Sequence, residues 1–486
     1  MVRSVMRFGF ALLLILAPLA SWSSVVSAPT VPAQPTGAAT RDVAKVYAEV
    51  CAACHGAKME GGKAQTLLDD TWVFGGDDAS MAATIREGRL AAGMPPFGAL
   101  LTGPEIRAMV YYLRETRATL RAGKWPGTTT PDRSVRKSER HAYRIEIVAD
   151  GLMTPWGMTF LPDGRLLLSE RPGTVRVLDV GGPLTPPIAG TPAVWAKQDG
   201  GLLDIAIHPD YGVNGWIYLA YCEPGPASTS TTKIVRGRIR DGRWVDQQTI
   251  YQSPADLYVA DNTHFGARFL FDKAGHLFFT IGDRGTMADA QSLGSPNGKI
   301  HRVLDDGGVP PDNPFVKTAG ALGIIWSVGN RNPQGLAWHP VTGELWSTEH
   351  GPRGGDELNV IEKGRNYGWP TVTYGINYDG TPITDKTLAP GLESPITYWT
   401  PSAAPSGIAF YTGARFPGWT NDLFVAMLAG HELRRVTVSG HAVTHQETIF
   451  KGFGRVRHVI NGPDGLLYVA LNDPGRIVRL VPAEAR

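Results

Sequence analysis

A recurring turn-and-strand unit is the feature that most limits how this chain can fold. Six times between residues 162 and 469, a turn rich in Pro, Asp and Gly is followed by a short apolar strand. The six units are 162–164 with 165–168, 209–210 with 216–219, 272–275 with 276–279, 340–343 with 344–346, 418–419 with 423–425, and 463–465 with 466–469. They recur roughly every 45 to 75 residues with almost no helical periodicity between them. A single such unit cannot bury both faces of its sheet, so the repeat predicts an all-β six-bladed β-propeller with four-stranded blades. A pair of β-sandwiches is the alternative architecture.

A different kind of motif precedes the repeats, at Cys51-Ala52-Ala53-Cys54-His55. Two thiols three positions apart can add to the vinyl groups of a haem, and the adjacent imidazole can then bind the iron. A zinc half-site or a thioredoxin-type pair are the competing interpretations. The only other cysteine is Cys222, some 170 residues away, and no βαβ pattern surrounds the motif. We therefore predict one covalent haem c, and we expect Cys222, in a strand-like run, to be a buried small hydrophobe.

The second axial ligand of that haem is predicted to be Met94, in Gly93-Met94-Pro95-Pro96-Phe97-Gly98. The two prolines hold the backbone extended, so that a thioether can reach the iron from a loop. Core packing is the alternative for Met94, and it is the expected role of Met81 and Met109, which fall in helix-like segments. His/Met ligation raises the potential of a haem and suits an electron acceptor.

Helix signals surround these haem-binding motifs. We expect helices at residues 41–54 and 80–88, and a third that begins at a capping box formed by Thr102 and Glu105. The segment resembles class I cytochrome c, on the strength of its CxxCH and GMPPFG motifs. The expected small all-α cytochrome c domain covers residues 29–120, a Pro/Gly/Thr-rich linker covers 121–140, and the propeller covers 141–486.

The first 28 residues predict export. Arg3 and Arg7 precede an apolar run, Phe8 to Leu19, and small residues that end at Ala28. This pattern is typical of a signal peptide at residues 1–28, with a retained N-terminal anchor as the alternative. The run is too short to span a bilayer comfortably, so no transmembrane helix is expected in the mature chain. Because haem attachment also requires export, we expect a periplasmic or secreted protein.

The charge of the chain gives no sign of a nucleic-acid partner. Its formal net charge is 47 − 45 = +2, and removal of the two arginines of the signal peptide leaves 45 − 45 = 0. Neither nucleic acid nor an anionic membrane is therefore an expected partner.

Four polar, glycine-rich segments of the propeller carry residues with chemical potential. They surround His264, which can act as a base, Arg331 and Asn332, the stretch 349–359, and Arg455 with Arg457. The arginines can bind a polyanionic ligand, and the Gly/Pro turn at 351–355 with its flanking carboxylates offers oxygen ligands to a hard cation such as Ca²⁺. Taken singly, each segment is equally typical of a solvated loop between blades.

Taken together and in this order, the segments resemble the soluble pyrroloquinoline quinone (PQQ) sugar dehydrogenases, and specifically their aldose sugar dehydrogenase branch. The resemblance runs from about Leu152 to the C-terminus and includes Asn332-Pro333-Gln334-Gly335, EHGPRGGDELN at 349–359 and NYGWP at 366–370. It implies a six-bladed propeller that carries PQQ and Ca²⁺.

The resemblance also implies roles for individual residues. His264 matches the general base, and Arg331 and Asn332 match residues at the quinone and the substrate. Other matched positions are Gly351 and Pro352 as carbonyl ligands of the Ca²⁺ that holds PQQ, Glu357 and Tyr367 with Thr373 at a second Ca²⁺ site, and Tyr378, Arg455 and Arg457 as cofactor contacts. One departure puts a contact in doubt: where the family has Gln, three residues before Leu-Leu, this chain has Asp199, with Gln198 one position early.

The sequence thus predicts an enzyme that oxidises an aldose at C1 to the lactone with PQQ. Its electrons would pass one at a time to its own haem and then to an outside acceptor, such as a cytochrome, a copper protein or an oxidase. The alternatives are a Ca²⁺-dependent propeller lactonase and a non-enzymatic binding propeller that carries an electron-transfer domain.

Overall fold

The computed structural model describes residues 41–123, 126–261 and 263–483. The predicted signal peptide, residues 1–28, lies outside these ranges. In the described part, no helix has the length and apolar character that crossing a membrane would require.

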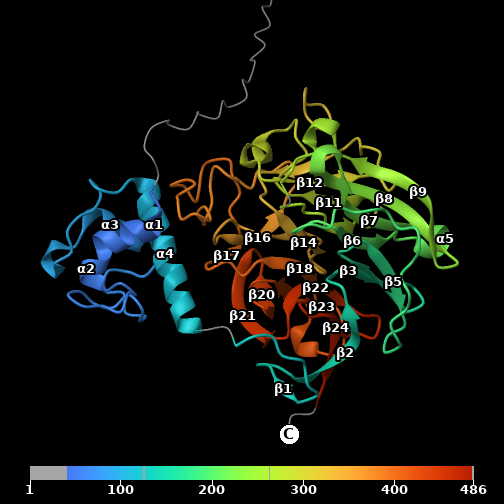
Figure 1. Ribbon diagram of the computed structural model, residues 1–486, viewed down its shortest axis with the longest axis horizontal. Helices are drawn as coiled ribbons and strands as arrows, with labels where there is room; N and C mark the ends of the chain where they lie inside the picture. Colours follow the sequence, from blue (N-terminus) through green and yellow to red (C-terminus); the bar gives the residue numbers. More distant parts are fainter. Residues whose placement is uncertain (1–40, 124–125, 262, 484–486) are drawn as a thin grey trace, which may run out of the picture. The chain divides into compact units, whose positions relative to one another are not determined.

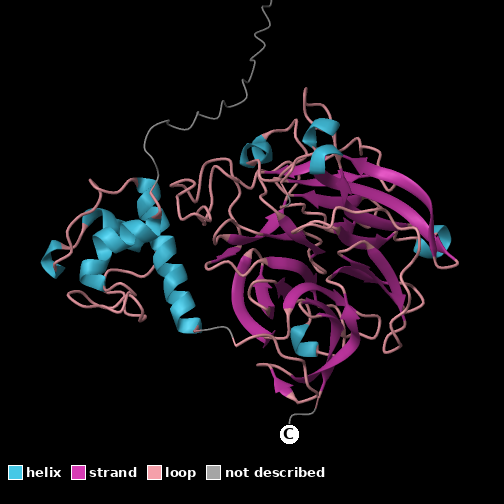
Figure 2. Ribbon diagram, in the orientation of Figure 1, coloured by secondary structure: helices cyan, strands magenta, loops and turns pink. Residues whose placement is uncertain are grey.

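The longest helices of the chain lie in its N-terminal part, where Figure 2 shows little strand. α1 (Val43–Val46), a π-helical turn (Tyr47–Cys51) and α2 (Ala52–His55) follow one another without a break. Then come α3 (Asp78–Glu87), a 3₁₀ turn (Leu90–Ala92) and α4 (Gly103–Ala122). The three helices expected from the sequence are therefore confirmed.

The capping box that begins α4 is confirmed in detail. The Thr102 side chain accepts a hydrogen bond from the backbone N–H of Glu105, and the Glu105 carboxylate accepts one from the backbone N–H of Thr102 at 2.9 Å. The helices bury one small core, in which Met81 and Met109 are 4% and 1% exposed. Both methionines thus have the core role expected of them.

The described residues after α4 form six antiparallel sheets, which confirms the six-bladed β-propeller (Figure 1). The first three sheets are β3 (Pro155–Phe160), β4 (Leu166–Glu170) and β5 (Thr174–Leu178); β6 (Leu202–Ile207), β7 (Ile217–Pro224), β8 (Ser230–Arg240) and β9 (Arg243–Gln252); and β10 (Phe269–Phe271), β11 (Leu277–Ile281), β12 (Lys299–Val303) and β13 (Ile325–Val328). The next two are β14 (Pro333–Trp338), β15 (Leu345–Glu349), β16 (Asp356–Ile361) and β17 (Thr397–Trp399); and β18 (Pro405–Phe410), β19 (Leu423–Met427), β20 (Glu432–Ser439) and β21 (Ala442–Lys451).

The sixth sheet closes the ring. It contains β22 (Arg455–Asn461), β23 (Leu467–Asn472), β24 (Gly475–Pro482), β2 (Ala142–Leu152) and β1 (Arg136–Lys137). β2 pairs with β24, so strands from the two ends of the propeller share one blade. The expectation of four strands in every blade is therefore wrong for two sheets: the β3–β5 sheet has three strands, and the sixth has five because β1 adds to β2.

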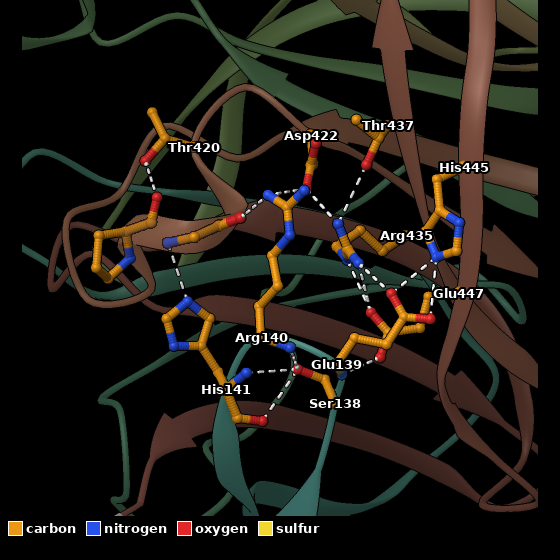
Figure 3. Close-up of polar contacts among 12 residues, drawn as sticks. Ser138, Glu139, Arg140, His141, Thr420, Asp422, Arg435, Thr437, His445 and Glu447 are labelled. Carbon is orange, nitrogen blue, oxygen red and sulfur yellow. Dashed lines mark hydrogen bonds and ion pairs between the residues drawn. The ribbon is translucent and has the colours of Figure 1, made fainter.

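The chain enters the propeller through a charged cluster, shown in Figure 3. Arg435 of β20, whose side chain is fully buried, forms ion pairs with Asp422 at 2.6 Å, Glu447 at 2.7 Å and Glu139 at 3.2 Å. His445 also contacts Glu139, at 2.7 Å. The segment just before β2 is thus tied to the neighbouring blade. α4 ends at residue 122, and β1 begins at residue 136.

The innermost strands of the blades contact one another in a closed circle: β3, β6, β10, β14, β18, β22 and again β3. Apart from β1 and β2, which come first in the chain and form the outer edge of the sixth sheet, the strands of each sheet follow outward from the innermost one. The innermost strands therefore run in the same direction along the channel. Their N-terminal ends therefore lie at one mouth of the channel. Cys222 of β7 is fully buried between sheets, as expected.

Candidate active site

Most of the propeller residues singled out in the sequence lie at the mouth where the innermost strands begin. His264 precedes β10, Arg331 and Asn332 directly precede β14, and Arg455 with Arg457 begin β22. Asp199 precedes β6 at the same mouth. The ring therefore brings together side chains that lie up to about 250 residues apart in the sequence.

His264 forms a close pair with Asp283, which follows β11. His264 Nδ1 lies 2.6 Å from Asp283 Oδ1, and the indole N–H of Trp369 donates to Asp283 Oδ2 at 2.8 Å. Burial acts to raise the pKa of Asp283, but the hydrogen bond and the charge of His264, together with Arg331, outweigh it and lower that pKa. Because Asp283 is then ionised, His264 donates through Nδ1 and its Nε2 is left as the basic atom. The pair has the geometry of an oriented general base.

Arg331 and Asn332 are both buried beside this pair. The Arg331 guanidinium donates to the carbonyl oxygens of His350 at 3.1 Å and Gly351 at 2.5 Å. Asn332 Oδ1 accepts from the backbone N–H of Gly266, at 3.1 Å, and so braces the segment that carries His264. The positive charge of Arg331 is thus held by neutral carbonyl oxygens.

Arg457 provides a second, partly buried positive charge at the mouth. It donates to the amide oxygen of Gln334 at 3.1 Å and the hydroxyl of Ser406 at 3.4 Å. Among the described residues, nothing accepts a hydrogen bond from its buried Nε. Burial and the nearby Arg268 and Arg455 lower the pKa of Arg457 to about 9. Two guanidinium groups held by neutral acceptors, Arg331 buried and Arg457 partly buried, fit a ligand with several carboxylates.

Tyr378 and Asp199 lie at more open positions. Tyr378 is 72% exposed, and its ring lies 6.0 Å from the Arg331 guanidinium. Asp199 is also exposed, and its negative charge raises the pKa of Arg457 against the effect of burial. The acid at the place of the family's Gln therefore acts on the same arginine that is predicted to face the cofactor.

The Gly351–Pro352 turn is held in a tight backbone conformation. The Gly351 N–H donates to Asp356 Oδ1 at 2.9 Å, and a Cβ at position 351 would lie 2.2 Å from the Gly354 carbonyl oxygen. Asp356 Oδ2 accepts from Ser402 and from the N–H groups of 403 and 404, and burial raises the pKa of Asp356 to about 6. The Gly351 carbonyl already contacts the cationic Arg331, so it faces a position that suits positive charge.

A second acidic feature lies behind this turn. Glu349 and Glu357 are paired across β15 and β16, and Asn359 Nδ2 donates to both, at 3.2 and 3.1 Å. Burial raises the pKa of Glu349 to about 7, and burial together with the Glu349 charge raises that of Glu357. With Tyr367 and Thr373, both glutamates line a cavity of about 10 Å³, room for one small ion or water. Two buried carboxylates side by side favour a bound cation.

The oxygen atoms available to a cation here are limited. The Tyr367 hydroxyl donates to the Val360 carbonyl and accepts from the Glu362 N–H, so only its carbonyl oxygen is left as a ligand. Across the described ranges, no three His, Cys, Asp or Glu side chains are grouped as a metal site.

The haem-binding motif begins in the π-helical turn and ends α2. Burial raises the pKa of Cys51 to about 11, whereas Cys54 is exposed. His55 Nδ1 lies 3.2 Å from the Gln65 carbonyl oxygen, which would leave Nε2 to bind iron. Met94 is bridged through its backbone to Arg89 in a loop whose Gly93 has φ of 80°, and its side chain packs partly against the helical core. Cys51, Cys54 and His55 thus lie on one continuous helical stretch, and Met94 lies in a separate loop.

Two residues of the propeller site were given no role from the sequence: Asp283, and Trp369, which appeared only within the NYGWP stretch. Asp283 and Trp369 complete the arrangement around His264, yet they lie 19 and 105 residues further along the chain. The Gly282-Asp283-Arg284-Gly285 turn directly after an apolar strand was the available signal for Asp283. Glu349 was likewise recognised only as part of a motif, because its pairing with Glu357 depends on strand register.

The fold and the site define a class of protein: a propeller oxidoreductase joined to a c-type cytochrome module. The chain belongs to the family described as Glucose / Sorbosone dehydrogenase, which matches residues 152–479. Residues 38–113 match a second family, Cytochrome C oxidase, cbb3-type, subunit III.

Relatives of known name agree with this assignment. The chain is 40% identical over 345 residues to the aldose sugar dehydrogenase YliI of Escherichia coli, an alignment that covers 70% of this chain and 92% of that protein. The apo-form structure of the E. coli soluble aldose sugar dehydrogenase is 39% identical, with a TM-score of 0.68, and covers 70% of this chain and 100% of that one. The PQQ-bound aldose sugar dehydrogenase of Streptomyces coelicolor is 28% identical, with a TM-score of 0.58, and covers 72% of this chain and 99% of that one.

The cytochrome module has relatives of a different kind. It is 40% identical over 73 residues to the cbb3-type cytochrome c oxidase subunit FixP of a Bradyrhizobium strain, an alignment that covers 14% of this chain and 25% of that protein. The two parts of the chain thus have separate relatives, a sugar dehydrogenase and an oxidase cytochrome subunit.

Proposed function

We propose that the protein is a PQQ-dependent aldose dehydrogenase that oxidises its sugar at C1 and passes the electrons to its own haem c. The observation that carries the proposal is the oriented His264–Asp283 pair, which lies at the same mouth as the cationic Arg331 and Arg457. A base alone would suit many hydrolases, including a lactonase. A base next to cationic groups that fit a polyanion suits a quinone cofactor with several carboxylates.

In this proposal, Arg455 and Arg457 hold the cofactor carboxylates, and Tyr378 contacts the cofactor at the open side. PQQ, when bound, accepts two electrons as a hydride. His264 Nε2 removes the proton of the C1 hydroxyl, Asp283 stabilises the imidazolium that results, and Arg331 with Asn332 orients the reacting groups. The sugar thereby loses one proton and one hydride and becomes the lactone.

Calcium is the cation we propose for both oxygen-rich positions. Gly351 and Pro352 would offer carbonyl oxygens to the ion that holds the cofactor, and Glu357, Tyr367 and Thr373 would surround a structural ion. Neutralising the buried Glu349–Glu357 pair is what a structural cation would do for stability.

The haem would be attached through Cys51 and Cys54 and bound by His55 and Met94. The signal peptide 1–28 and the haem both support a periplasmic or secreted location, where a further cytochrome, copper protein or oxidase would take the electrons. Covalent connection of the two domains keeps the haem at high effective concentration near the propeller.

The test is reconstitution of the purified full chain with PQQ and Ca²⁺, followed by a screen of aldoses and alcohols. Each sugar is mixed with the protein in a stopped-flow spectrometer, and haem reduction is recorded with and without an added dye. Aldose-dependent haem reduction that requires both PQQ and Ca²⁺ is the expected result. Lactone hydrolysis without haem reduction would identify the lactonase, and binding without turnover would identify a binding propeller.

A further inference from the structure

Arg284, the residue after Asp283, is a buried cation close to the proposed base but without a role in the chemistry described above. Its side chain is 2% exposed and extends away from the strand end in a turn where Arg284 itself has φ of 52°. In that turn, Asp283 is directed at the imidazole of His264 and Arg284 at the backbone that precedes it. The consecutive residues Asp283 and Arg284 thus both contact the part of the chain that carries His264.

The guanidinium group of Arg284 contacts the chain on both sides of His264. It donates to the carbonyl oxygen of Thr263, and to that of Asp261 at 2.7 Å. Its central carbon lies 3.6 Å from the centroid of the Phe265 ring. A third contact, with the carbonyl of Ser230 at 3.3 Å, reaches β8 of the preceding blade. One planar group therefore ties the residues before and after His264 to a rigid strand.

The described backbone around His264 lacks the support of a regular strand, so hydrogen bonds from Arg284 are needed to fix its position. None of the described residues between the short helix Ala255–Leu257 and β10 belongs to a regular strand. His264 itself adopts φ of 53°, in the left-handed region that costs a non-glycine residue free energy. The approach of the two turns is close, because a Cβ at position 285 would lie 2.5 Å from Asp261 Oδ2. Hydrogen bonds from a charged donor contribute more to stability than neutral ones.

We infer that Arg284 is a positioning residue for His264: it fixes the backbone on which the base is carried, while Asp283 fixes the ring. The inference rests on the proposed function, since it assigns Arg284 to the base of that reaction. A displacement of about 1 Å at a reacting group can lower a rate about 10²-fold, so loss of this tie should act mainly on kcat.

The experiment compares Arg284→Ala and Arg284→Lys with Arg236→Ala. Arg236 is a matched control: it is 8% exposed, lies over the ring of Trp216 at 4.5 Å and donates to the carbonyl of Asp305, all away from the His264 segment. Lys keeps the charge but offers a single nitrogen in place of the two that donate to the carbonyls of Thr263 and Asp261. Each variant is assayed for kcat and KM with a dye acceptor, with and without added guanidinium ion. Hydrogen exchange of the peptide spanning 263–268 is measured in the protein without cofactor.

The expected results are a fall in kcat of about 10²-fold for Arg284→Ala with KM changed less than about threefold, and a smaller fall for Arg284→Lys. Guanidinium ion should restore part of kcat in Arg284→Ala, and exchange at 263–268 should accelerate in both Arg284 variants only. A kcat within threefold of the parent would overturn the inference, as would an equal loss in Arg236→Ala or unchanged exchange at 263–268. If Arg284→Ala does not fold, Arg284→Lys decides by the same measurements. A parent protein that oxidises no aldose would instead overturn the proposed function, and the exchange result would still report on the tie.

Discussion

Replacing Asp283 with Asn tests how the proposed base is oriented, with an almost unchanged side-chain shape. Asp283 Oδ1 accepts from His264 at 2.6 Å and from the Gly285 N–H at 3.1 Å, while Oδ2 accepts from Trp369 at 2.8 Å. Asn has one oxygen and one NH₂ group. If the oxygen faces Trp369, the NH₂ group faces His264 Nδ1 and moves the imidazole proton to Nε2, where the substrate proton should be accepted. If the oxygen faces His264, the Trp369 N–H meets another donor.

The size of the effect follows from these contacts. A buried donor left without an acceptor costs about 1–3 kcal/mol, and losing the charge that stabilises the imidazolium costs about 1.5–3 kcal/mol more. The sum, roughly 3–6 kcal/mol, corresponds to a fall in kcat of about 10²- to 10⁴-fold. Cofactor binding should be retained, because Asp283 is not among the groups predicted to hold it.

The assay is turnover per bound PQQ with a dye acceptor, compared between the aldose and its C1-deuterated form. A larger isotope effect in Asp283→Asn would show that hydrogen transfer has become limiting. Asp272→Asn is the control, since Asp272 forms the same kind of contact with His276 at 2.8 Å in the turn that joins β10 to β11. A kcat for Asp283→Asn within tenfold of the parent, at full cofactor occupancy, would refute the assigned orientation.

Four further predictions address the base, the cation, the haem and the fold. His264→Ala should keep PQQ bound but lower turnover about 10²- to 10⁴-fold, as measured by absorbance and dye reduction; normal activity per bound PQQ would contradict its role as base. EDTA should release PQQ and abolish activity, and Ca²⁺ with PQQ should restore both; full activity in calcium-free protein would count against the Gly351 turn. Met94→Ala should keep the haem covalently attached, lower its potential and slow haem reduction by sugar while dye reduction is unchanged; equally fast haem reduction would mean that Met94 is not the ligand or the haem not the acceptor. Arg435→Leu should lower the free energy of unfolding by about 3–5 kcal/mol in urea, because it leaves Asp422 and Glu447 buried without their partner; a change under 1 kcal/mol would show that the cluster in Figure 3 contributes little.

Local signals predicted local structure well. The Thr102 capping box sets the start of α4 because both of its hydrogen bonds join residues three apart. The turn-and-strand repeat likewise predicted six blades, since each unit depends on its own turn and its own apolar strand. The number of strands per blade was less predictable, because the pairing of β2 with β24 joins residues more than 320 positions apart.

In the candidate site, too, local features could be predicted from the sequence and long-range contacts could not. The sequence by itself determined which chemical groups are present: the CxxCH motif, the imidazole of His264 and the arginines of β22 are all evident as residue types in recognisable patterns. Only the tertiary structure decided their partners. Asp283 reaches His264 because β11 returns beside β10, and Glu349 opposes Glu357 because of the register of β15 and β16. Side-chain chemistry is a property of each residue, whereas hydrogen bonding, burial and charge repulsion depend on distances that exist only once the ring has closed.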